Sequence, residues 1–153
     1  MKNNNATKFL TVKLIILFLL LNIVFWGCKK GGLISDERRQ SLFEENIIGE
    51  NFIVTLATDN GTDITGNYSG YTFVLGKTDL YSGPLQAQKN GITSTGSWSA
   101  NDDYSKLIIT LPATPAEFVF LSRSWRFTSK SATLLKLAPW GSAEALVLYM
   151  AHQ

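Results

Sequence analysis

Apolar and polar residues alternate along most of the chain after residue 50, and this period of two predicts β-strands. The pattern is clearest in residues 92–99 and 106–111, which flank the turn-forming sequence Asn101-Asp102-Asp103. Successive side chains of a strand point to opposite faces, so these two runs predict a hairpin with one apolar face. That face consists of Ile92, Trp98, Leu107, Ile109 and Leu111.

Similar runs predict six further strands, at residues 52–58, 71–75, 79–88, 124–128, 132–137 and 145–151. Asn60-Gly61 and Asn90-Gly91 are typical of tight hairpin turns. Pro84 cannot donate a ladder hydrogen bond, which suggests that its strand lies at a sheet edge or contains a bulge. The apolar run 118–121 fits either a short strand or a plug. Short strands separated by regular turns are typical of an antiparallel sandwich or barrel.

One stretch has the helical period instead. Residues 35–46 begin with Ser35, a good N-cap residue, and place Leu42, Phe43 and Ile47 on one apolar stripe. Gly49 is expected to end the helix. The charged side chains on the rest of this helix are most simply a solvated face.

The N-terminal residues 1–27 have the pattern of a signal peptide. Three lysines precede an apolar run of 13 residues, Leu14 to Trp26, and Gly27-Cys28 follows directly. Such a run is shorter than the roughly 20 apolar residues that span a bilayer core. The segment resembles a bacterial lipoprotein signal, with Cys28 as the lipidated residue. We expect residues 28–34 to form a tether and residues 35–153 to form one domain.

Cleavage after residue 27 would change the charge of the chain. The 126 remaining residues keep eleven of the fourteen basic residues and all twelve acidic ones, so the net charge becomes −1 instead of +2. This balance leaves no basic patch that would indicate a nucleic-acid partner. Cys28 is the one cysteine of the chain, so no internal disulfide can form.

Several short motifs resemble the small lipocalin-like lipoproteins of Bacteroidetes over about residues 37–150. They are Thr62-Asp63-Ile64-Thr65, Ser69-Gly70-Tyr71-Thr72-Phe73, Gly96-Ser97-Trp98, Lys106-Leu107-Ile108-Ile109, Ser124-Trp125 and Ser131-Ala132-Thr133. The resemblance implies an all-β, lipocalin-like up-and-down barrel of about eight strands, preceded by a short helix and tethered by Cys28. Members displayed on the cell surface tend to carry acidic residues directly after the cysteine. Lys29-Lys30 stands there in this chain, which favours an outer-membrane lipoprotein that faces the periplasm.

No catalytic or metal-binding constellation is visible in the sequence. His152 is the one histidine and lies near the C-terminus, where chain ends fray. The carboxylates are scattered, except for Asp102-Asp103 in a predicted turn where Asp is favoured for its own backbone contacts. We therefore predict no enzymatic activity, no metal and no cofactor.

Two functions from different classes remain. An eight-stranded barrel can either fill its interior with side chains or hold one small molecule. In the first hypothesis the barrel binds a small apolar or amphipathic ligand, with Tyr71, Phe73, Trp98, Trp125 and Phe127 as its lining. In the second, these aromatics are the core of a solid barrel whose loops bind another envelope protein. An enclosed apolar cavity would support the first hypothesis, and a filled interior would support the second.

The period of two also predicts where the cations lie. It places Lys106, Arg126 and Lys136 on outward positions and Arg123 in a loop. A ligand inside the barrel would therefore be neutral, or would keep its charge at the mouth.

Overall fold

The computed structural model describes residues 35–153, of which Asp36–Gln153 form one compact unit. The predicted signal peptide 1–27, the tether 28–34 and the lipidation site Cys28 lie outside the described residues. Within residues 35–153, no helix has the length and apolar character needed to cross a bilayer.

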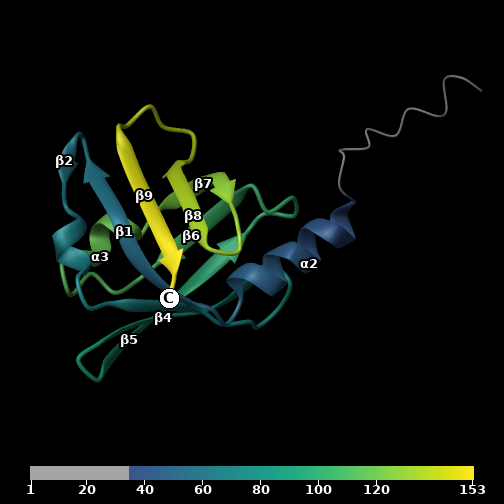
Figure 1. The fold of residues 1–153 in the computed structure, drawn as a ribbon, viewed down its shortest axis with the longest axis horizontal. Helices are drawn as coiled ribbons and strands as arrows, with labels where there is room; N and C mark the ends of the chain where they lie inside the picture. Colours follow the sequence, from purple (N-terminus) through teal and green to yellow (C-terminus); the bar gives the residue numbers. More distant parts are fainter. Residues whose placement is uncertain (1–34) are drawn as a thin grey trace, which may run out of the picture. The chain divides into compact units, whose positions relative to one another are not determined.

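The unit is built from one antiparallel sheet and three short helical segments (Figure 1). The helix α2 (Asp36–Ile47) comes first, the 3-10 helix η1 (Thr65–Tyr68) lies between β2 and β3, and the one-turn helix α3 (Phe118–Leu121) lies between β6 and β7. The strands are β1 (Asn51–Asp59), β2 (Thr62–Asp63), β3 (Thr72–Leu75), β4 (Ser82–Lys89), β5 (Ile92–Ala100), β6 (Lys106–Thr110), β7 (Ser124–Lys130), β8 (Leu134–Pro139) and β9 (Leu146–His152).

The sheet closes into a barrel. Its strand order is β2-β1-β3-β4-β5-β6-β7-β8-β9, and β1 also pairs with β9, from Phe52 with His152 to Asp59 with Leu146. The two-residue β2 only extends the hairpin at the end of β1, so the other eight strands form the ring. The predicted all-β, lipocalin-like up-and-down barrel with a preceding helix is confirmed.

Two of the predicted turns have the backbone that their sequences favour. Asn60 and Gly61 have φ values of 48° and 85°, and Asn90 and Gly91 have values of 52° and 78°. A positive φ at both central residues defines the type I′ turn, whose twist matches that of the strands it joins. These turns connect β1 to β2 and β4 to β5.

The barrel interior is formed by the inward side chains of all eight ring strands. Phe52, Phe73, Leu85, Trp98, Leu107, Trp125, Leu137 and Leu148 are each at most 2% exposed. Among residues 35–153, no polar or charged residue is buried. The core therefore rests on apolar packing, together with the hydrogen bonds of its aromatic side chains.

A helical segment covers each end of the barrel. The helix α2 runs directly into the start of β1 and buries Phe43 and Ile47 there. The helix α3 connects the end of β6 to the start of β7, which is the opposite end in an up-and-down barrel, and it buries Phe118, Phe120 and Leu121. Figure 1 shows the two helices on opposite sides of the barrel.

Two expectations need correction, the inward position of Ile92 and the edge or bulge position of Pro84. Ile92 is 72% exposed, because it directly follows the Asn90-Gly91 turn and lies at the tip of a hairpin. Of the two alternatives for residues 118–121, the plug is correct, because these residues form a one-turn helix that buries Phe118, Phe120 and Leu121.

Pro84 lies at neither a sheet edge nor a bulge. Its strand β4 pairs with β3 on one side and β5 on the other without a register shift. The Pro84 carbonyl accepts a hydrogen bond from Gly76 N, at 2.8 Å, just past the end of β3. The N and C=O of one residue point to the same side of an antiparallel strand, so the missing Pro84 donor faces the place where β3 has already ended.

Candidate functional site

The five aromatic residues predicted to line a ligand site all face the interior side of the barrel wall. Tyr71, Phe73, Trp98 and Trp125 are buried, and Phe127 is half-buried against the core. The rings do not surround one open space. They divide into two groups, one at each end of the barrel, and each group packs against aromatic side chains from outside the ring strands.

At the α2 end, Phe43 fills the space between the candidate rings. Its ring centroid lies 5.6 Å from that of Trp98, 4.6 Å from that of Tyr104 and 6.2 Å from that of Phe127. The Trp98 indole Nε1 donates to the Gly76 carbonyl at 2.6 Å. These contacts close the α2 end with aromatic side chains.

At the α3 end, Phe118 and Phe120 take the corresponding position. The Phe118 ring is 5.3 Å from the ring of Tyr71, and the Phe120 ring is 5.5 Å from the ring of Trp125. Trp125 Nε1 donates to the Leu121 carbonyl at 2.9 Å, so α3 is fixed to the barrel by both packing and a buried hydrogen bond.

Two buried tyrosines complete the ends and were not among the predicted site residues. The Tyr68 hydroxyl donates to the Glu117 carbonyl at 2.8 Å, and the Tyr104 hydroxyl donates to the Leu80 carbonyl at 2.9 Å. Tyr68 lies in η1 and Tyr104 in the β5–β6 loop, where no strand or helix period exists to reveal an inward side chain. Their hydroxyls donate to carbonyls that are distant in sequence, so these hydrogen bonds become visible only in the folded structure.

Burial favours the neutral form of three tyrosines at the ends of the barrel. Burial raises the pKa of Tyr68 far above its ordinary value, and the nearby Glu117 carboxylate adds to this effect. Burial, with a smaller contribution from the nearby Tyr81, also raises the pKa of Tyr104. For Tyr71, burial raises the pKa and so does the hydrogen bond to Glu117 Oε1, at 3.1 Å.

Cavities lined by residues 53–153 lie along the outside of the barrel and are open to solvent, and three of them bear on function. The first, of about 510 Å³, lies over the outer faces of β4, β5 and β6. The second, of about 450 Å³, lies over the seam between β1 and β3 and is lined in part by Val54, Tyr68 and Tyr71. This seam is weakly paired, because β1 and β3 share only the pairs Asn51–Val74 and Phe52–Phe73.

The third cavity, of about 600 Å³, lies at the α3 end, and we call it the end groove. It is lined by Asp59, Ile64, Asn67, Tyr68, Ala116, Glu117, Val119, Phe120 and Arg123. Val119 is 57% exposed there, although it is a large apolar residue. The Arg123 guanidinium lies 5.1 Å from the Phe120 ring, and its Nε donates to the Phe120 carbonyl at 2.7 Å. The end groove thus combines an apolar floor with charges of both signs.

His152 is part of the wall and not of any cavity described above. Its backbone pairs with Phe52 at the end of β9, and its Nε2 lies 2.5 Å from Glu50 Oε2. Within residues 35–153, no group of three His, Cys, Asp or Glu side chains is placed to hold a metal ion. The absence of enzymatic activity stays a prediction.

The fold therefore defines an eight-stranded antiparallel β-barrel protein with a packed interior. A solved structure with a similar fold is that of a DUF4847 family protein from Bacteroides vulgatus, with a TM-score of 0.53 and 18% sequence identity. The match covers 72% of this chain and 96% of that protein. No protein-family model matches the sequence, and no curated protein matches it either. At this level of identity the likeness concerns the fold alone.

Proposed function

We propose that this chain is a lipoprotein of the cell envelope, related to the lipocalin-like lipoproteins that its motifs resemble. Residues 1–27 would be cleaved, and acyl chains on Cys28 would hold the barrel at the outer membrane on its periplasmic side. The proposal rests on the lysine-rich start, the 13-residue apolar run and the cysteine that follows it. A fold similar to that of a Bacteroides protein is consistent with it.

For the barrel itself we propose a non-enzymatic interaction role, in which a solid body presents its outer surface to another envelope protein. The observation that carries this proposal is the packing of the candidate lining. Trp98 lies against Phe43 and Trp125 lies against Phe120, so aromatic rings occupy the two ends where a ligand would enter. The end groove is the recognition site that we favour, because exposed Val119 and charged Arg123 adjoin there.

The lipid anchor is tested by fractionation of cells that produce the Cys28→Ala variant. One acyl chain gives only marginal membrane binding, and two or more give stable anchoring. We expect the alanine variant to leave the membrane fraction, with the wild-type chain as control. A variant that is still cleaved after residue 27 but remains with the membranes would show that the anchor is not the lipid.

The solid barrel is tested with residues 29–153, the mature chain without its lipidated cysteine, by titration with an environment-sensitive apolar dye. The emission of Trp98 and Trp125 follows any binding inside the barrel, and native mass spectrometry of protein purified from its own cells detects a retained small molecule. We expect neither saturable dye binding nor a retained molecule. Saturable quenching of these buried tryptophans would instead establish a ligand site.

A small apolar ligand remains the second candidate, and the seam between β1 and β3 is the observation in its favour. Tyr68 belongs to the lining of both the cavity over this seam and the end groove. If η1 moved outward, the interior would open through the seam. A Tyr68→Ala variant should then take up the apolar dye more readily than the wild type, whereas a solid barrel predicts a loss of stability without saturable uptake.

A further inference from the structure

The outer face of strands β6, β7 and β8 carries three cations, and we call this face with its flanking aromatics the basic wall. Lys106, Arg126 and Lys136 occupy outward positions on three successive strands. No aspartate or glutamate occurs in β6, β7, β8 or β9. This basic face contrasts with the domain as a whole, which has a net negative charge. Residues 35–153 hold all twelve acidic residues and only nine of the fourteen basic ones.

Two of these cations lie directly opposite each other. Lys106 and Arg126 are paired across β6 and β7, and the pair faces outward. Like charges at directly opposed positions of a sheet are destabilising. Within residues 35–153, the ion pairs involve other residues, so no carboxylate offsets this repulsion. The Lys106–Arg126 pair lowers the stability of the fold, and no carboxylate of the domain compensates for it. We therefore infer that an anionic partner outside the domain does so.

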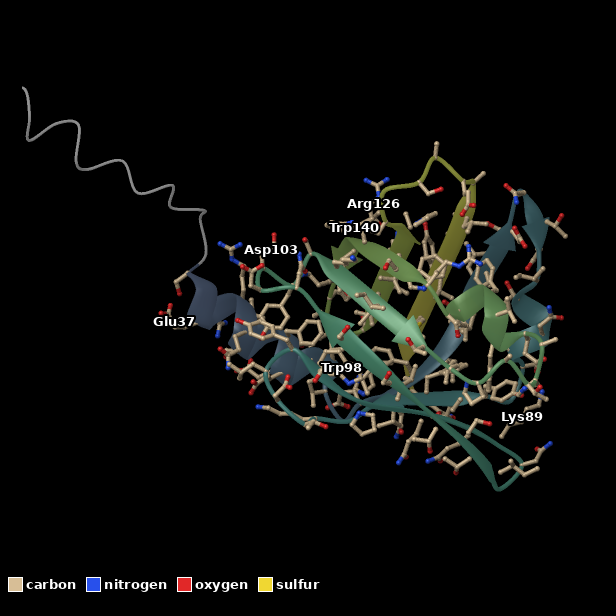
Figure 2. The ribbon with its side chains drawn as sticks, turned by 180° about the vertical axis from the view of Figure 1, so that it is seen from behind. Glu37, Lys89, Trp98, Asp103, Arg126 and Trp140 are labelled. Atoms are coloured by element: carbon tan, nitrogen blue, oxygen red, sulfur yellow. The ribbon has the colours of Figure 1, made fainter. Side chains whose placement is uncertain are left out.

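Aromatic rings border the cations. The Lys106 ammonium lies 5.4 Å from the centre of the Trp140 ring, and the Lys136 ammonium lies 5.0 Å from that of Tyr149. Trp140 is 41% exposed. Figure 2 shows Arg126 and Trp140 on the same side of the barrel, with Lys89 well away from them.

Two of the acidic groups at the rims of the basic wall, Asp103 and Glu144, have partners outside it. Asp103, in the β5–β6 loop, accepts a hydrogen bond from Ser105 N at 2.9 Å. Glu144, in the β8–β9 loop, lies 3.6 Å from the Arg123 guanidinium. Neither carboxylate neutralises the wall.

We propose that the basic wall docks on an anionic bilayer surface. Lys and Arg side chains near such a surface are attracted to its phosphates, and tryptophan favours the interface between headgroups and acyl chains. An acidic protein partner would satisfy the cations equally well. The half-exposed indole beside them favours a membrane, because the ring can enter the headgroup layer while the cations stay at the phosphates. The inference rests on the proposed lipid anchor, which would keep the wall within reach of the bilayer and so make a weak contact effective.

The test uses residues 29–153, which lack the lipidated cysteine. This part is expected to fold on its own, because residues 36–153 supply every strand of the closed ring and the helices at both ends. The probes are phosphatidylcholine vesicles with and without about 30% phosphatidylglycerol. Of the tryptophans in the described chain, Trp140 is exposed while Trp98 and Trp125 are buried, so a shift of the tryptophan emission reports contact at the basic wall.

We expect binding to the anionic vesicles only, with a blue shift of Trp140 emission and weakening at higher salt. Lys106→Gln and Arg126→Gln should each lower the partition coefficient about fivefold. Lys89→Gln is the matched control, because Lys89 also lies over an aromatic ring, at 4.6 Å from that of Tyr71, but outside the basic wall.

Two results would overturn the proposal. One is a folded domain that does not distinguish anionic from neutral vesicles. The other is an equal loss of binding in Lys89→Gln and Lys106→Gln, since net charge alone would then explain the effect. Because the test omits the lipid, a failure here is distinct from a failure of the Cys28→Ala fractionation.

Discussion

Trp98 donates its indole hydrogen to the carbonyl of Gly76 across 2.6 Å, and Gly83 of the intervening strand β4 leaves the room for this bond. A Cβ atom on Gly83 would lie 2.0 Å from Gly76 O and 3.0 Å from Trp98 Nε1. Gly76 O is a backbone atom, so it cannot move aside as the end of a flexible side chain could. A glycine at this position is therefore a requirement of the core.

Gly83→Ala should be destabilising by about 1–3 kcal/mol, the usual cost of overpacking a core. Gly66→Ala is the control, because a Cβ on Gly66 meets no atom within 4 Å. Urea unfolding of both variants measures the difference. If the two variants unfold at the same urea concentration, the close approach at Gly83 has no energetic weight.

Trp98→Ala and Trp125→Ala should each lower the free energy of unfolding by about 3–5 kcal/mol, since both rings are buried. Trp140→Ala should lower it much less, because its ring is 41% exposed. Chemical denaturation of the three variants checks the order. A Trp140 variant that was the least stable of the three would contradict the assignment of the inward face.

Phe43→Ala should open the α2 end of the barrel. The ring of Phe43 contacts those of Trp98, Tyr104 and Phe127, so its removal leaves a cavity with apolar walls. We expect a loss of about 3–5 kcal/mol and new binding of a small apolar molecule such as benzene, because such cavities stay dry. Leu42→Ala, at a half-buried neighbour in the same helix, is the control and should bind none.

Stability should fall at alkaline pH. The folded barrel raises the pKa of Tyr68, Tyr71 and Tyr104 above their unfolded values, chiefly by burial. A group with a raised folded pKa contributes its stability fully below the unfolded pKa, near 10, and loses it as the pH rises further. Unfolding midpoints from pH about 7 to about 12 test this.

Tyr68→Phe provides the internal control for the pH series. The variant loses the hydrogen bond to Glu117 O and should be less stable at neutral pH. Because phenylalanine cannot ionise, its stability should fall less steeply than that of the wild type above pH about 10. An unchanged slope would show that Tyr68 does not contribute to the alkaline transition.

Strand periodicity was sufficient to predict the wall of the barrel. It placed Trp98, Leu107 and Trp125 inward and Arg126 outward, and the structure confirms these orientations. The reason is local, because a pleated strand that is buried on one face must alternate. The Asn-Gly turns were equally readable, since their backbone needs residues that tolerate a positive φ.

Features set by tertiary contacts were not predictable in this way. Tyr68 and Tyr104 lie in segments without a period, and their inward direction depends on carbonyl oxygens of Glu117 and Leu80, which are distant in sequence. Pro84 was misjudged because its effect depends on where the neighbouring strand β3 ends. The division of the candidate lining into two groups depends on Phe43, Phe118 and Phe120, which belong to helices outside the ring.

The pairing of β1 with β9 has a consequence for how each newly synthesised chain folds. The ring closes where its first strand meets its last, so residues around Phe52 must wait for those around His152 to be synthesised. Contacts so distant in sequence form slowly, and until then the two edge strands carry unpaired backbone groups that invite aggregation. A chain truncated before β9 would keep those edges open. The synthesis of β9 thus decides whether the product is a closed barrel or an open sheet.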